Sequence, residues 1–124
     1  MKICVVGAGA IGGLMGAKFA LAGEDVTLID QGAHLAAIRD KGLTLIWDGE
    51  HVISNIKATD SPEEAGPQDL VVLAVKAHYL EQVAPKISHL TGPGTMIMTV
   101  QNGIPWWYFH NHGGPLDGHR LESL

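Results

Sequence analysis

The first hundred residues alternate between short apolar runs and longer segments of helical character. The apolar runs predict strands at residues 2–6, 25–29, 69–75 and 95–100. Helices are predicted between and after them, at about residues 11–22, 33–41 and 79–90. Apolar strands separated by helices are typical of a parallel sheet that is covered on both faces. The pattern therefore predicts an α/β fold.

Other segments refine this pattern. Residues 43–47 and 52–58 read as strands joined by Asp48-Gly49-Glu50, which predicts an inserted β-hairpin. Residues 59–68 are a polar stretch to which no helix or strand is assigned, and residues 105–109 are predicted to be a single helical turn. The pattern fades after that point, so we expect one domain over residues 1–110 and a poorly patterned tail over 111–124.

The helix predicted over residues 79–90 is amphipathic. It carries an internal proline, Pro85, which should kink it or start a second turn. Its apolar side chains fall on one face, at Leu80, Val83, Ile87 and Leu90.

Composition narrows the function classes. The 124 residues are 46% hydrophobic and 17% charged, which favours a folded core over disorder. The net charge is −5 and basic residues are scattered, so nucleic acid and anionic membranes are poor candidate partners. The only cysteine, Cys4, lies in the first apolar run and is expected to be a buried thiol without a disulfide. The start has no secretory signal pattern, and we expect a cytoplasmic protein.

A glycine motif carries the strongest functional signal. Residues 7–12 read Gly-Ala-Gly-Ala-Ile-Gly, between a predicted strand and a predicted helix. Gly7 would allow the tight turn, Gly9 the close approach of a pyrophosphate, and Gly12 close packing of helix on strand. Asp30 follows Gly12 by 18 residues, at the end of the second strand. This context favours a Rossmann-like dinucleotide-binding unit over a plain strand-to-helix turn. The residues expected to contact the cofactor here are Gly7, Gly9, Ala10, Ile11, Gly12, Asp30 and Gln31.

Three polar residues follow predicted strands, where ligands bind in open parallel sheets. Asp30 could accept both ribose hydroxyls of an adenosine, or it could cap the next helix. Lys76 could hold a ribose hydroxyl or polarise a carbonyl, or it could be a solvated surface lysine. Asn102 offers a donor and an acceptor for a carboxamide or hydroxy acid, or it could be a turn residue beside Gly103.

Other chemistries lack their sequence signatures. Seven histidines include His110, His112 and His119, but no cysteine or carboxylate accompanies them at a metal-ligand spacing. We therefore predict no metal site. The chain also lacks a phosphate-binding Gly-Lys-Ser/Thr loop and a Gly-x-Ser-x-Gly elbow.

The glycine motif, the hairpin, Val75-Lys76-Ala77 and Gln101-Asn102-Gly103 occur in this order. Together they resemble the N-terminal domain of ketopantoate reductases (2-dehydropantoate 2-reductases), over residues 1 to about 105. The resemblance implies binding of NADPH and hydride transfer to the ketone of a 2-oxo acid in pantothenate synthesis. It also implies that Lys76 and Asn102 line the nicotinamide and substrate side, as the catalytic residues of this domain.

Two departures from the family pattern affect these expectations. The family's helical second domain supplies its main catalytic lysine and a substrate-binding glutamate, and the sequence ends before it. We therefore expect a fragment or remnant domain that is inactive alone. The family's arginine that meets the NADP 2′-phosphate is replaced by Gln31, beside Asp30. The resemblance implies NADP, whereas the carboxylate of Asp30 favours NAD.

Two rival functions stay open: a non-catalytic module that senses NAD(P), and an FAD-binding domain, whose motif also begins Gly-x-Gly-x-x-Gly. A homodimer is also expected, because four consecutive aromatic residues cannot all be hidden by one helical turn. These residues are Trp106, Trp107, Tyr108 and Phe109.

Overall fold

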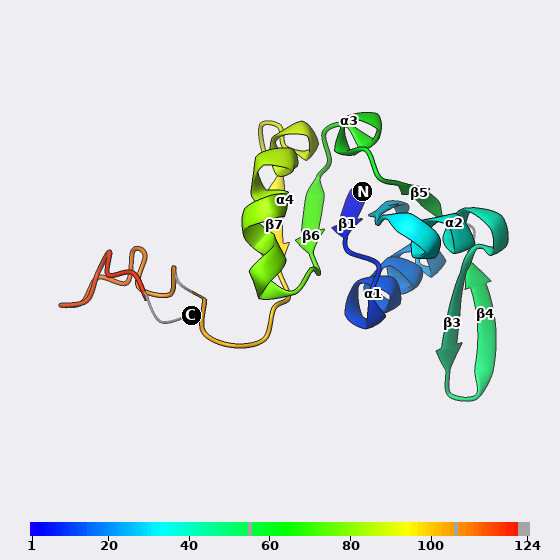
Figure 1. Ribbon diagram of the computed structural model, residues 1–124, viewed down its shortest axis with the longest axis horizontal. Coiled ribbons are helices and arrows are strands. Elements are labelled where there is room, and N and C mark those ends of the chain that lie inside the picture. Colours follow the sequence, from blue (N-terminus) through cyan, green and yellow to red (C-terminus); the bar gives the residue numbers. More distant parts are fainter. Residues whose placement is uncertain (55, 106, 122–124) are drawn as a thin grey trace.

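A parallel sheet of five strands forms the centre of the computed structural model, which describes residues 1–54, 56–105 and 107–121 (Figure 1). The strand order is β5-β2-β1-β6-β7. The strands are β1 (Lys2–Val6), β2 (Asp25–Ile29), β5 (Lys57–Thr59), β6 (Leu70–Leu73) and β7 (Met96–Thr99). Every pair is parallel, as the apolar runs predicted.

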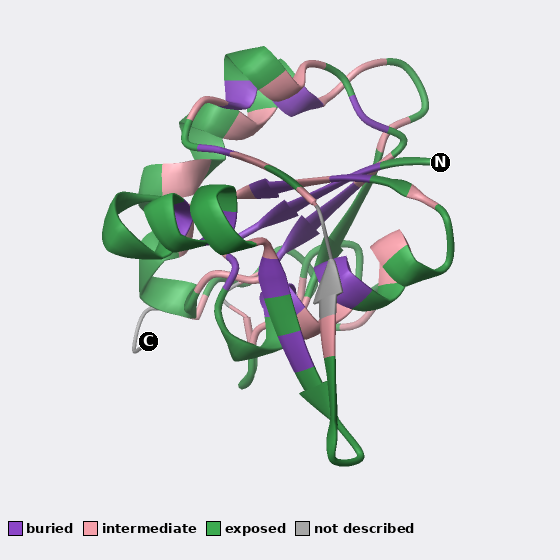
Figure 2. Cartoon of the chain, turned by 90° about the vertical axis from the view of Figure 1, so that its right-hand side faces the viewer, coloured by how far each residue is buried: buried purple, intermediate pink, exposed green. Residues whose placement is uncertain are grey.

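Side chains of the central strands divide between two cores because successive residues of a strand point to opposite faces. Ile3 and Val5 of β1 belong to one core, and Cys4 and Val6 to the other. All four are nearly or completely buried. Figure 2 shows these buried strands at the centre of the molecule, with exposed helical surfaces around them. Both faces of β1 are therefore covered, which explains its unbroken apolar sequence.

The first face is covered mainly by α1 (Ala10–Leu21), with help from α2 (Gly32–Lys41). Small residues let α1 approach the sheet closely. A Cβ atom added to Gly16 would lie 2.7 Å from Cδ2 of Leu28 in β2. In α2 the buried residues are Leu35 and Ile38, one turn apart.

The second face is covered by α4 (Leu80–Ile87), which lies between two 3₁₀ turns, η1 (Ala77–Tyr79) and η2 (Ser88–Leu90). The amphipathic prediction for residues 79–90 is confirmed, since the apolar face packs against the core and Leu90 is fully buried. Pro85 lies inside α4. The expected single helix is instead one α-helix between two tighter turns.

The predicted hairpin forms from β3 (Leu43–Trp47) and β4 (Glu50–Ser54), and Figure 2 shows it projecting from the body. Trp47 pairs with Glu50, so the loop contains two residues rather than the three expected. Asp48 and Gly49 both have positive φ, of 51° and 79°, as a type I′ turn requires. The strand predicted over residues 52–58 was wrong. It is two strands, since β4 belongs to the hairpin while β5 joins the main sheet beside β2.

A short helix, α3 (Pro62–Ala65), forms within the polar stretch at residues 59–68, where no helix was predicted. The hydroxyl of Ser61 accepts a hydrogen bond from the Glu64 amide, and Pro62 occupies the first turn. A serine cap followed by proline and two glutamates is a recognised helix start. The sequence therefore contained a signal for this helix that the sequence analysis missed.

The chain after β7 runs away from the sheet, at the opposite end of the molecule from the hairpin (Figure 1). The helical turn expected at 105–109 is replaced by turns with hydrogen bonds between residues three apart. For example, the Tyr108 amide donates to the Pro105 carbonyl at 3.0 Å. Trp106 lies outside the described residues. Tyr108 is 52% exposed. In the part of the chain that the structure describes, no helix has the length and apolar character to cross a membrane.

Candidate functional site

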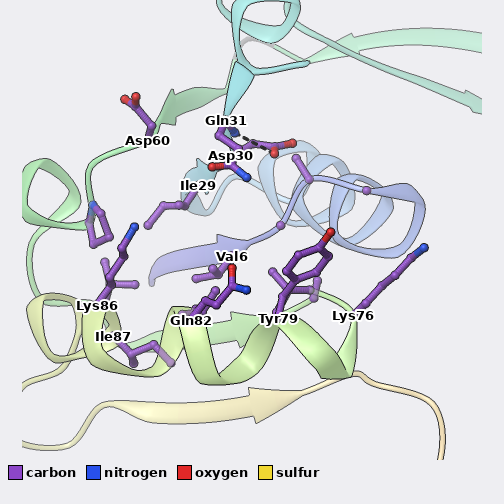
Figure 3. Close-up of a pocket in the computed structure, with 18 of the residues that line it drawn as sticks. Val6, Ile29, Asp30, Gln31, Asp60, Lys76, Tyr79, Gln82, Lys86 and Ile87 are labelled. Atoms are coloured by element: carbon purple, nitrogen blue, oxygen red, sulfur yellow. Dashed lines mark hydrogen bonds between the residues drawn. The ribbon is translucent and has the colours of Figure 1, made fainter. Parts of the chain in front are cut away.

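A cleft of about 440 Å³ opens at the carboxyl ends of β1, β2 and β6. The chain leaves β1 toward β2 on one side, and β6 lies on the other side of β1. This reversal of strand order makes the crevice a topological switch point, where ligands bind in open α/β sheets. Figure 3 shows the two walls, with Asp30, Gln31 and Asp60 on one side and residues of η1 and α4 on the other.

The glycine turn between β1 and α1 forms the inner end of this cleft. Gly7 has φ +96°, and its amide donates to the Ile29 carbonyl at 2.8 Å. A Cβ atom on Gly12 would lie 1.9 Å from the Gly7 carbonyl oxygen, so only glycine fits there. Gly9 differs from both, because a Cβ atom there would meet none of the described atoms within 4 Å. The turn is therefore tight on its inner side and open above Gly9.

The first turn of α1 begins at this open position. Gly9 is the N-cap residue, and no described side chain caps it or places an acidic group in the first turn. Ala10 and Ile11 follow, both exposed, with Ile11 55% accessible. The first N–H groups of a helix lack intrahelical partners and carry its positive dipole end. The arrangement can accept an anionic group such as a phosphate.

Asp30 lies at the mouth of the cleft. Its carboxylate accepts a hydrogen bond from the Gln31 amide at 2.8 Å and lies 2.6 Å from Nδ1 of His34. The N-cap residue of α2 is Gln31, so Asp30 is not the helix cap that was considered as its alternative role. A carboxylate has about four acceptor positions, so two contacts leave capacity for a ribose hydroxyl. His34 was missed by the sequence reasoning, although it stands four residues after Asp30, one helical turn away.

The opposite wall carries polar side chains that the sequence reasoning also missed. Tyr79, Gln82 and Lys86 line the cleft together with Lys76, and Figure 3 shows the first three pointing across it from the helix. Their spacing of three and four residues places them on one stripe of the helix. This stripe was the available signal, because it runs beside the apolar stripe that packs on the sheet and so borders the same cleft. Two ammonium groups thus face a cleft that also contains two carboxylates, Asp30 and Asp60.

The three polar residues predicted at the strand ends are not all brought together. Asp30 and Lys76 both line the cleft. Asn102 is exposed just after β7 and is not among the described lining residues. Its neighbour Gln101 instead bonds to the end of β6, through Nε2 to the carbonyls of Leu73 and Val75.

The tail histidines form ring contacts. Phe109 lies edge-on to His112 at 5.6 Å and to His119 at 6.3 Å between ring centroids. Among the described residues, no three histidine, cysteine or acidic side chains are grouped as metal ligands would be.

The doubly wound sheet, the glycine turn and the cleft at the switch point are the architecture typical of nucleotide-binding α/β domains. Residues 3–105 match the family model described as ketopantoate reductase PanE/ApbA. The chain belongs to this family.

Individual relatives agree with this assignment. The chain is 51% identical, over its whole length, to a 2-dehydropantoate 2-reductase from Mesorhizobium japonicum. Its fold matches the crystal structure of a candidate ketopantoate reductase from Ralstonia solanacearum MolK2, with a TM-score of 0.90 and 48% identity over 96% of this chain. A D-mandelate dehydrogenase solved with NADH and anilino(oxo)acetate matches 84% of the chain, with a TM-score of 0.77 and 32% identity. The chain spans 38%, 37% and 34% of the lengths of these three proteins.

Proposed function

We propose that this chain is the dinucleotide-binding part of an NAD(P)H-dependent reductase that acts on the ketone of a 2-oxo acid such as ketopantoate. The open space above Gly9, directly before the uncapped start of α1, is the observation that supports this proposal most strongly. A pyrophosphate could lie there against backbone N–H groups without displacing any described side chain.

The expected roles follow from position. Gly7 and Gly12 shape the turn, while the backbone of Gly9, Ala10 and Ile11 would hold the phosphates. Asp30 and Gln31 would hold the adenosine ribose at the mouth of the cleft.

Lys76 lies beyond the end of β6, and Asn102 lies beyond the end of the neighbouring strand β7. These two side chains would orient the nicotinamide end of the cofactor and the ketone of the substrate. The bound cofactor supplies the hydride, and the protein supplies binding and orientation. Asn102 reaches this role only if the segment after β7 turns toward the cleft.

NAD and NADP differ in charge at the adenosine ribose, which is expected to lie near Asp30. Its carboxylate can accept hydrogen bonds from both ribose hydroxyls of NAD, whereas it would repel the 2′-phosphate of NADP. Lys76 and Lys86 also face the cleft and could offset part of this repulsion. We propose NAD as the preferred cofactor and NADP as the weaker one.

Turnover by this chain alone is not expected. It corresponds to little more than a third of its relatives' length, and the resemblance assigns the principal acid and the substrate-carboxylate contact to the remaining part. Positioning and proton transfer each contribute orders of magnitude to a reaction rate.

Calorimetric titration with NADH, NADPH and FAD tests the proposal. We expect binding of the nicotinamide dinucleotides, no binding of FAD, and no reduction of ketopantoate by the isolated chain. A chain that binds neither NADH nor NADPH would refute the proposed function.

A further inference from the structure

Gln101, two residues after the end of β7, is hydrogen-bonded to the end of the neighbouring strand β6. Its Nε2 donates to the Leu73 carbonyl at 2.8 Å and to the Val75 carbonyl at 2.9 Å. The Leu73 carbonyl also accepts from the Val100 amide at 3.2 Å, as the pairing of β6 with β7 ends. The side chain of Gln101 therefore continues the connection between the two strands beyond their last backbone bond.

The orientation of this amide is set by its surroundings. If nitrogen and oxygen were exchanged, an acceptor would face two carbonyl acceptors. In the observed orientation Oε1 of Gln101 is buried and has no hydrogen-bond partner among the described residues. Burying an acceptor without a hydrogen-bond partner destabilises the folded state. The two N–H bonds are thus made in spite of this cost.

The clamped segment is also in contact with the glycine turn. A Cβ atom on Gly7 would lie 3.1 Å from the Val75 amide nitrogen and 2.9 Å from Cγ1 of Val75. Lys76 follows Val75 directly, and Asn102 follows Gln101 directly. The side-chain amide of Gln101 therefore links the segment that contacts the glycine turn to Lys76 and Asn102. These are the two polar residues expected at the nicotinamide end.

We infer that Gln101 is a positioning residue for the dinucleotide, which acts through Val75 and Lys76 without touching the ligand. This inference rests on the proposed function. Loss of the two N–H donors would release the end of β6 and loosen the wall of the cleft behind Gly7 and at Lys76. The adenosine end, which lies at Asp30 across the cleft, would be affected least.

The chain contains a matched control. Nε2 of Gln68 likewise donates to two carbonyls, those of Ala65 and Gly66, at 2.8 and 2.9 Å. Gln68 is buried and precedes β6 at the end opposite to the cleft. Substituting it removes the same kind and number of hydrogen bonds far from the proposed binding site.

The experiment compares Gln101→Met with Gln68→Met, using calorimetry with NADH and AMP and thermal unfolding of each protein. We expect Gln101→Met to weaken NADH binding about tenfold while AMP binding changes less than twofold. Gln68→Met should lose similar stability and keep both affinities. Gln101→Asn, which retains the amide on a shorter arm, should give a smaller loss and covers the case in which Gln101→Met does not fold.

Three outcomes would overturn the inference. Unchanged NADH affinity in both Gln101 variants would do so, as would an equal loss in Gln68→Met. An equal loss of AMP affinity would show a general disturbance of the fold. If the wild-type chain binds neither NADH nor NADPH, the proposed function itself has failed.

Discussion

Gly9 and Gly12 belong to the same six-residue motif, but substitutions at the two positions should have different effects. A substitution at Gly9 should weaken NADH binding, and one at Gly12 should lower the stability of the fold. A side chain at Gly9 points into space that none of the described atoms occupies, and the backbone there has φ −65°, which any residue can adopt. A side chain at Gly12 would meet the Gly7 carbonyl oxygen at 1.9 Å and Cβ of Ala74 at 2.8 Å. We therefore expect opposite consequences from two changes only three residues apart.

The stability effect of Gly9→Val is the sum of two small terms. Loss of glycine at a helix N-cap costs about 1 kcal/mol. Restriction of the unfolded chain offsets this by roughly 0.4–1 kcal/mol. The net change should lie within about 1 kcal/mol, which shifts Tm by no more than about 5 °C in a domain of this size. Gly12→Ala should cost at least about 3 kcal/mol, because backbone must move to relieve the contact.

Gly9→Val, which should change stability little, should have a large effect on NADH binding. The valine side chain at residue 9 would fill the space proposed for the pyrophosphate and separate it from the N–H groups of α1. We expect NADH affinity to fall at least a hundredfold, or about 2.7 kcal/mol. Differential scanning calorimetry and isothermal titration of the same samples measure both quantities. A Gly9→Val protein that unfolds near the wild-type temperature and still binds NADH normally would refute this account of the motif.

Three further results are expected. Asp30→Ala should narrow the preference for NAD over NADP about tenfold or more, and tighter binding of NADP than NAD by the wild type would contradict the electrostatic argument. Burial raises the pKa of the Cys4 thiol from 9.0 to about 12, so between these two pH values the thiol is ionised mainly in the unfolded chain. The unfolding free energy at pH 10 should therefore lose about 1.4 kcal/mol relative to neutral pH, a loss absent from Cys4→Ala in denaturant titrations. Light scattering should detect a dimer; a monomer at high micromolar concentration, unchanged by replacing Trp106 and Trp107 with serine, would exclude the aromatic interface.

The parts of the fold that follow from local chemistry could be predicted from the sequence. An apolar run such as residues 2–6 must be covered on both faces, and Asp48-Gly49 supplies the two positive φ values of a hairpin turn. The division of residues 52–58 between two sheets could not be predicted in the same way. Strand pairing is decided by distant partners, here β3 for one part and β2 for the other.

The same distinction between local and distant contacts applies to the candidate site. Gly7, Gly9, Gly12 and Asp30 were found because motif spacing reports the backbone path between β1 and β2. Residues of the opposite wall, such as Gln82 and Lys86, belong to a helix that follows β6, and only the folded sheet brings that wall to the glycine turn.

The inner end of the cleft and its two walls therefore carry different information about function. The glycine turn at the inner end consists largely of backbone, so it could bind a pyrophosphate but could not select among dinucleotides that share one. Selection requires side chains of particular charge or size, and those that line the cleft include Asp30 and His34 at one end, and Tyr79, Gln82 and Lys86 opposite. We therefore expect cofactor choice to be set by residues outside the motif that identifies the fold. For this reason the family assignment by itself does not decide between NAD and NADP, and the comparison of wild type with Asp30→Ala is the more informative measurement.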